Sequence, residues 1–124
     1  MHSRHLLPTL MVATLLCMAA APAMAHAKLV KADPGPDGNA MPMPAALRLT
    51  FSEAPELAFT RVEVTGPDQK ELATGKLMAA PDDPDTVIVP LPKDLPDGSY
   101  TVDWTAVADD GHKTSGHYGF KAMK

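Results

Sequence analysis

A period of two in the hydrophobic side chains constrains the fold of this chain most strongly. Apolar and polar residues alternate in the longest such run, whose apolar positions are Tyr100, Val102, Trp104 and Ala106. Shorter runs of the same kind occupy residues 47–52 and 61–64. Every second side chain of an extended strand lies on one face, so each run predicts a half-buried β-strand. No segment has a sustained helical period, and a mainly helical fold is therefore excluded.

Turn-forming sequences separate the predicted strands at intervals of about ten residues. They are "DPGPDGN" at 33–39, "GPD" at 66–68, "APDDPD" at 80–85 and "LPDGS" at 95–99. Two more strands are predicted at 86–91 and 117–123, the second with Tyr118 and Phe120 facing inward and His117 facing outward. The pattern predicts an all-β domain, a small Greek-key sandwich or barrel of about seven strands with an immunoglobulin-like arrangement.

Residues 1–25 are typical of a cleavable signal peptide. A short basic start is followed by an apolar run from Leu6 to Ala21, which is too short to span a membrane as a helix. Small residues at Ala23 and Ala25 then mark a cleavage site before His26. We expect export and a mature domain of residues 26–124.

Cleavage would change the charge and the sulfur chemistry of the chain. It removes Arg4 and the single cysteine, Cys17, and leaves 10 basic and 15 acidic residues. No disulfide can then form, so a packed core must hold the fold. The acidic balance argues against nucleic acid or an anionic membrane surface as the partner.

The histidine at the expected new terminus offers two metal ligands in one residue. The α-amine of His26 and a ring nitrogen can chelate one ion, and little conformational entropy is lost on binding because the pair is nearly pre-formed. Any residue can follow a cleavage site, however, so a terminal histidine without a role remains the alternative.

A second group of potential ligands lies in the segment "VADDGHKTSGHYGF", residues 107–120. Asp110 and His112 are two positions apart, so in an extended segment both side chains leave the same side. Imidazole with carboxylate suits Cu(II), Zn(II) or Ni(II). Asp-Gly is also common in turns, and a solvated loop is the alternative interpretation.

Three segments in this order resemble a known family: "HAKLVKADP" at 26–34, "LRLTFSE" at 47–53 and "YTVDWTAVADDGHKTSGHYGF" at 100–120. Together they resemble the CopC-type periplasmic copper-binding and copper-resistance proteins, over essentially the whole mature chain. The resemblance implies a seven-stranded cupredoxin-like barrel or sandwich. It also implies a site for one Cu(II) made by the amine and ring of His26 with Asp110 and His112.

The same resemblance points to Glu53, the acid of "FSE", as a weak ligand or a hydrogen-bond partner at copper. A structural role at the strand end is an equal alternative. Some members carry a Cu(I) site in a methionine-rich loop, but the comparable stretch, residues 65–78, has only Met78 and no histidine. We therefore expect that Cu(I) site to be absent.

Three further residues are weaker candidates. Met41 and Met43 could offer thioethers, but methionines flanked by prolines more often cover an apolar edge. His117 could assist metal capture, although an outward-facing histidine is more often a plain surface residue.

The function expected from these features is non-enzymatic. We expect a monomeric periplasmic Cu(II)-binding protein that sequesters copper, confers resistance, or delivers copper to an inner-membrane transporter of the CopD type. Its ligands must lose protons to bind, so affinity should fall as pH drops from about 7 to about 5. Two alternatives stay open: a small copper-dependent oxidative enzyme with an N-terminal histidine chelate, and a metal-free interaction domain.

Overall fold

The computed structural model describes residues 26–124, so the expected signal peptide lies outside the described residues. This part of the chain forms eight strands and one 3-10 turn, η1. The elements are β1 (Leu29–Asp33), β2 (Asn39–Ala40), β3 (Ala46–Phe51), η1 (Leu57–Phe59), β4 (Arg61–Thr65), β5 (Met78–Ala80), β6 (Asp83–Pro90), β7 (Gly98–Val107) and β8 (Lys113–Ala122). No helix within the described range is long and apolar enough to cross a membrane.

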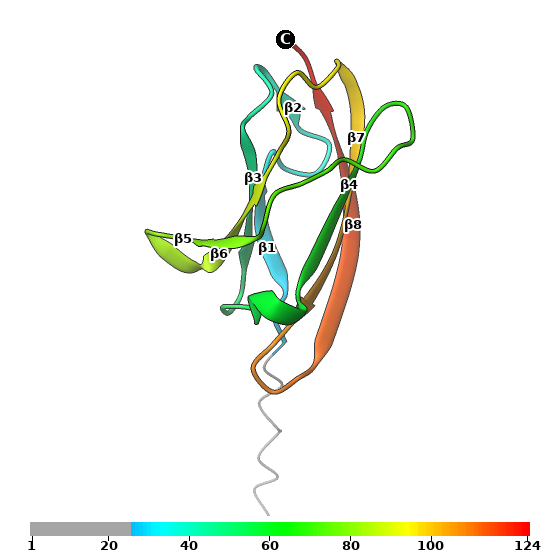
Figure 1. Ribbon diagram of the computed structural model, residues 1–124. Coiled ribbons are helices and arrows are strands. Elements are labelled where there is room, and N and C mark those ends of the chain that lie inside the picture. Colours follow the sequence, from blue (N-terminus) through cyan, green and yellow to red (C-terminus); the bar gives the residue numbers. More distant parts are fainter. Residues whose placement is uncertain (1–25) are drawn as a thin grey trace, which may run out of the picture.

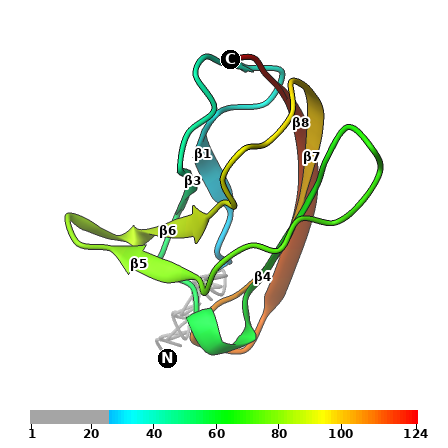
Figure 2. The same cartoon turned by 45° about the horizontal axis from the view of Figure 1, so that its top comes forward.

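The strands form two four-stranded sheets that pack face to face (Figures 1 and 2). One sheet has the order β1-β3-β6-β5, and the other has the order β2-β8-β7-β4. The expected all-β class is therefore confirmed, as a sandwich of two separate sheets rather than a closed barrel. The structure has eight strands where about seven were expected, and β2 and β5, only two and three residues long, are too short to show an alternating pattern.

The alternation predicted from the sequence determines which side chains form the core. The inward positions of β3 in one sheet are buried, and so are those of β4, β7 and β8 in the other sheet. Tyr100 stacks on Phe120, and Phe51 meets Trp104 edge to face, each pair with ring centroids 5.4 Å apart. Each such buried side chain contributes roughly 1.5–3 kcal/mol relative to an exposed position. The Phe51–Trp104 pair joins the two sheets, whereas Tyr100 and Phe120 are neighbours on paired strands of one sheet.

Strands β7 and β8 form a long hairpin, with unbroken register from Gly98↔Ala122 to Val107↔Lys113. The final strand begins at Lys113, earlier than the sequence predicts, because pairing with β7 keeps its polar first residues extended. The connecting loop, residues 108–112, lies at the end of the sandwich where the described chain begins, opposite the C-terminus (Figure 1). The hairpin therefore carries the predicted Asp110 and His112 to the same end as His26.

Candidate functional site

Hydrogen bonds to two strands fix the first residues of the domain. The hydroxyl of Ser52, just after β3, donates to the carbonyl of His26 at 2.8 Å and accepts from the N–H of Lys28 at 2.9 Å. On the other side, the hydroxyl of Thr114 in β8 donates to the carbonyl of Ala27, whose side chain is fully buried. These bonds attach residues 26–28 to both sheets and hold His26 beside the β7–β8 loop.

The loop between β7 and β8 is a tight turn. The N–H of Ala108 donates to the carbonyl of His112 at 3.0 Å, and the N–H of Gly111 donates to the carbonyl of Ala108 at 2.9 Å. Gly111 has φ +85°, a left-handed conformation that strongly favours glycine. The carboxylate of Asp110 accepts the N–H of His112 at 3.0 Å, a typical Asx turn. The turn holds the side chains of Asp110 and His112 on its solvent-facing side.

The three residues that the sequence suggests as copper ligands lie together at this end. The imidazole rings of His26 and His112 have centroids 5.3 Å apart and planes tilted by 58°. The Nδ1 atom of His112 lies 2.7 Å from Oδ2 of Asp110. His26 is half-buried, whereas Asp110 and His112 are exposed. A small group of two imidazoles and one carboxylate therefore faces solvent.

Asp110 is held in its charged form. The hydrogen bond from the His112 backbone lowers its pKa below the ordinary value, and the His112 ring lowers it further. A carboxylate can only accept a hydrogen bond, so Nδ1 of His112 carries the proton. The lone pair of His112 is then on Nε2, which is the nitrogen left to bind a metal.

Two polar atoms near this end are buried and lack a hydrogen-bond partner among the described residues: Nδ1 of His26 and Oε1 of Glu53. Leaving a buried polar atom unsatisfied costs about 1–3 kcal/mol. Glu53 is half-buried and directly follows Ser52, the residue that binds the His26 carbonyl. Both atoms are metal-ligand types, and a bound cation would satisfy them.

No three His, Cys, Asp or Glu side chains of residues 26–124 are placed so that all could bind one ion as they stand. Asp110 and His112 are engaged with each other, and another expected donor, the α-amine of His26, is a main-chain atom and not a side chain. The chemistry of these donors, imidazole, carboxylate and amine, suits a copper ion.

The two methionine candidates lie far from this group. Met41 follows β2, which pairs with the last residues of β8, about 30 Å along that strand from the loop. The Met41 side chain is 65% exposed, and Met43 packs against the core. The interpretation of Met43 as cover for an apolar edge fits this position.

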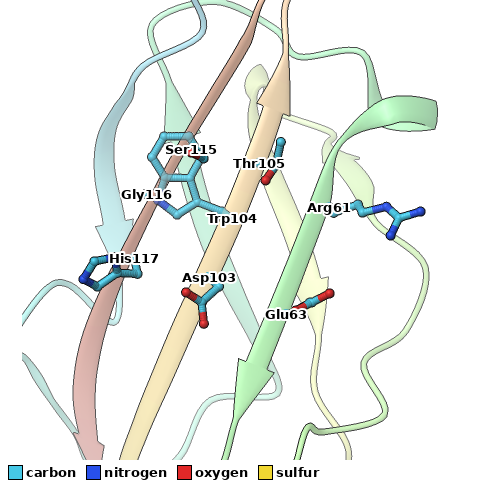
Figure 3. Close-up of a pocket in the computed structure, with 8 residues that line it drawn as sticks. All are labelled: Arg61, Glu63, Asp103, Trp104, Thr105, Ser115, Gly116 and His117. Atoms are coloured by element: carbon cyan, nitrogen blue, oxygen red, sulfur yellow. The ribbon is translucent and has the colours of Figure 1, made fainter.

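His117 is also outside the group, on the outer face of the second sheet. It pairs in register with Asp103, and Asp103 pairs with Glu63 on β4. These residues line a shallow hollow of about 600 Å³ (Figure 3). Trp104 reaches the edge of this hollow but belongs to the core, beneath Gly116. His117 faces outward, as the strand parity predicts.

Sequence reasoning missed two residues that position the site. Ser52 and Thr114 lie inside the quoted segments, but nothing in their spacing indicates that their hydroxyls bind the main chain at residues 26 and 27. Pairing of a hydroxyl with a distant carbonyl is a tertiary contact, which becomes visible only once the two sheets are stacked.

The chain is similar to known proteins over most of its length. The CopC domain model matches residues 29–123. Protein YobA of Escherichia coli K12 is 41% identical over 96 residues, which make up 77% of each chain. Copper transport protein CutJ of Bacillus subtilis is 33% identical over 100 residues, 81% of this chain but 18% of CutJ. The crystal structure of PcoC, a methionine-rich copper resistance protein from E. coli, matches with TM-score 0.71 and 28% identity, over 80% of this chain and 100% of PcoC. The chain therefore belongs to the CopC domain family.

Proposed function

We propose that this protein binds one Cu(II) ion at the end of the sandwich formed by His26 and the β7–β8 loop. The observation that carries the proposal is the buried, unpartnered Nδ1 of His26, whose ring lies 5.3 Å from that of His112. A buried imidazole nitrogen with no hydrogen-bond partner is a ready metal ligand. Membership of the CopC family, in which PcoC is described as a copper resistance protein, supports copper as the ion.

The donor set favours the oxidised ion. The amine and Nδ1 of His26, Nε2 of His112 and one oxygen of Asp110 make three nitrogens and one oxygen, which suit the tetragonal preference of Cu(II). Copper should outcompete zinc there, because Cu(II) leads the usual affinity order. No sulfur ligand takes part, so redox cycling is not expected to be the task of the site.

Asp110 has two ways to act at this site. It either binds the ion through one oxygen, or it keeps its hydrogen bond with Nδ1 of His112 and orients that ring. Carboxylates often orient metal-bound histidines in this second way. Glu53 is the further acid, and its unpartnered Oε1 supports a role as a weak ligand or hydrogen-bond partner. Replacing each acid with its amide separates these roles, because only loss of a direct ligand changes the ligand atoms at copper.

Removal of residues 1–25 creates one of the ligands in this proposal. Before cleavage the nitrogen of His26 is a peptide nitrogen and does not bind as an amine. The precursor therefore lacks the complete site, and copper is held only after export to the periplasm. This order of events keeps the protein from taking up copper before it leaves the cytoplasm.

The protein acts as a monomeric carrier that sequesters copper or passes it to a membrane transporter of the CopD type. CutJ supports the transporter link, because a region like this chain forms 18% of a protein described as a copper transport protein. The names of CutJ and PcoC describe transport and resistance, and these roles need no catalytic turnover.

The decisive experiment compares the chain beginning at His26 with the same chain carrying one glycine before His26. A chain with one glycine after Lys124 is the matched control. Cu(II) affinity is measured by competition with a chelator, and the ligand atoms are read from the copper EPR spectrum. We expect the N-terminal glycine to weaken binding and change the spectrum, and the C-terminal glycine to do neither.

Equal affinity and identical spectra for all three chains would contradict the N-terminal chelate. Absence of Cu(II) binding by the unextended chain would instead favour a metal-free interaction domain. Oxidative cleavage of a polysaccharide in the presence of copper and a reductant would favour the enzyme alternative.

A further inference from the structure

The 3-10 turn η1 presents an aromatic side chain to solvent. Phe59 is 69% exposed, the highest value among the large exposed hydrophobic residues of the described chain. Its neighbour Leu57 packs against the core, so the turn already has its own hydrophobic anchor. The exposed ring of Phe59 therefore adds little to folding and is available for contact with a partner.

The turn is fixed and does not swing freely. The N–H of Glu56 donates to the carbonyl of Val107 at 2.8 Å, and the hydroxyl of Thr60 donates to the carbonyl of Glu56 at 2.8 Å. The same Thr60 hydroxyl accepts the N–H of Val107 at 3.4 Å, in a buried position. These bonds tie η1 to the end of β7, so Phe59 is presented on a rigid support.

Phe59 stands next to the loop that carries the proposed copper ligands. Figures 1 and 2 both show η1 beside the β7–β8 turn. One shallow hollow of about 450 Å³ joins the two elements. We call its lining the Phe59 patch: Ala58, Phe59, Arg61, Val107, Gly111 and Lys113. Gly111 lies between Asp110 and His112, so a molecule on this patch touches the metal loop itself.

The patch has a charge opposite to that of the chain. Arg61 and Lys113 are both exposed at its edge, and none of its six residues is acidic. Neither side chain forms an ion pair within residues 26–124. The whole chain, in contrast, has a net charge of −4. An exposed aromatic ring with two free cations complements a surface that is apolar at its centre and acidic at its rim.

We propose that the Phe59 patch is the docking surface for a membrane copper transport protein, whose extracytoplasmic face offers an apolar pocket flanked by carboxylates. This inference rests on the proposed copper-binding function and names the contact through which the ion is passed on. Docking on the patch brings the partner against Gly111 and therefore beside Asp110 and His112. Aromatic and arginine residues are enriched where protein interfaces bind most strongly, and Phe59 with Arg61 fits that composition.

CutJ supplies the argument for this class of partner. The chain matches only 18% of CutJ, so most of that copper transport protein lies outside the matched region. Where a CopC-like region and a larger transport protein share one chain, the two are held close together. Where the two are not covalently joined, a binding surface is needed to reach the same proximity.

In-cell photo-crosslinking tests the proposal. A benzoylphenylalanine residue replaces Phe59 in the full chain, or replaces Val30 in the matched control. Val30 is 62% exposed, lies on β1 in the other sheet from β4 and β7, and is not part of the patch. Cells of the source organism are irradiated, and crosslinked products are recovered through a C-terminal tag and identified by mass spectrometry. We expect position 59, and not position 30, to capture a membrane copper transport protein.

Charge reversal gives a second readout. Arg61→Glu should reduce the yield of that product about fivefold, as expected when an exposed ion pair becomes a repulsion. Lys93→Glu, an exposed cation in the loop at the opposite end of β7, should leave the yield unchanged. Both variants should bind Cu(II) with the affinity and EPR spectrum of the parent chain.

Several outcomes would overturn the docking surface. The docking surface would be wrong if position 59 gave no specific product, or if it gave crosslinks only to lipid or to a second copy of this chain. It would also be wrong if Arg61→Glu left the yield of the product unchanged. Failure of the parent chain to bind Cu(II) would contradict the proposed function instead. The copper measurement on the purified chain thus separates failure of one idea from failure of the other.

Discussion

The rings of His26 and His112 lie 5.3 Å apart, although the two residues come from opposite ends of the described chain. The segment of His26 is held by the hydroxyls of Ser52 and Thr114, which donate to the carbonyls of His26 and Ala27, and His112 is held by the turn that joins β7 to β8. The proposed copper site therefore depends on the correct stacking of both sheets. Copper should in turn stabilise the fold, since a ligand that binds only the native state raises its stability.

The two exposed histidines of the β7–β8 region offer a matched pair of substitutions. His112→Ala removes a proposed ligand and should weaken Cu(II) binding by at least about 100-fold. His117→Ala removes a residue that faces away from the group and should leave the affinity unchanged. Chelator competition measures both, and equal effects of the two variants would contradict the assignment of His112.

Ser52→Ala tests the positioning of the N-terminal segment. The variant loses the hydroxyl that joins the carbonyl of His26 to the N–H of Lys28, so the segment should become less ordered. We expect a loss of about 1 kcal/mol in the free energy of unfolding and roughly tenfold weaker copper binding. Urea unfolding with and without copper measures both quantities. Unchanged copper affinity would show that the segment orders without Ser52.

The pH dependence of copper binding should follow the nitrogen ligands and not Asp110. Hydrogen bonds from His112 lower the pKa of Asp110 below its ordinary value, so this carboxyl stays ionised from pH 7 down to 5. The loss of copper affinity over about that range then comes from protonation of imidazole and amine. Asp110→Asn should weaken binding at every pH without changing the shape of the profile. A profile that becomes flat in this variant would assign the titration to Asp110.

Tyr118→Phe should increase stability, most of all at alkaline pH. The Tyr118 hydroxyl is buried without a hydrogen-bond partner in the described chain, and burial, followed by the charge of Asp33, raises its pKa. A raised folded pKa means that native stability is complete below the unfolded value of about 10 and is lost above it. We expect a gain of about 1 kcal/mol near neutral pH and less alkaline unfolding.

Tyr100→Phe is the control for that substitution, because the Tyr100 hydroxyl donates to the carbonyl of Pro96. This variant should lose about 1 kcal/mol. The free energy of unfolding of both variants is measured by urea unfolding. A gain for Tyr118→Phe with a loss for Tyr100→Phe would support the unpartnered state of the Tyr118 hydroxyl, and equal losses in both variants would contradict it.

Gly116→Ala should destabilise the sandwich. A Cβ atom at this position would lie 2.7 Å from Cζ2 of Trp104, inside any normal contact. We expect a cost of about 1–3 kcal/mol and a shift in the fluorescence of Trp104, the single tryptophan. Gly119→Ala on the same strand is the control, because its nearest atom is 3.4 Å away. Equal stability of the two variants would contradict the tight packing of Trp104.

The sequence predicted those parts of the molecule that depend on local pattern. Alternation located the buried faces of β3, β4, β7 and β8, and the outward direction of His117 followed from it. The short strands β2 and β5 escaped prediction because they are set by pairing with distant partners. The likeness to the CopC family suggested His26, Asp110 and His112 together, and the structure places them at one end.

Tertiary contacts could not be predicted in the same way. The hydroxyl contacts of Ser52 and Thr114 join segments far apart in sequence, and no local signal encodes such a pair. The exposure of Phe59 was equally hidden, because a phenylalanine in a short turn is ordinarily expected to pack inward. Both features depend on how η1 and the N-terminal segment lie against the ends of the two sheets.

The length of the β7–β8 hairpin has a practical consequence. Because β8 runs for ten residues from the metal loop towards Lys124, a group attached after Lys124 emerges about 30 Å from His26 and from the Phe59 patch. A fluorophore, a surface linker or a further domain placed there leaves both the proposed copper ligands and the proposed docking surface open. The protein is thus suited to immobilisation through its C-terminus, with the end that carries His26 directed towards solution.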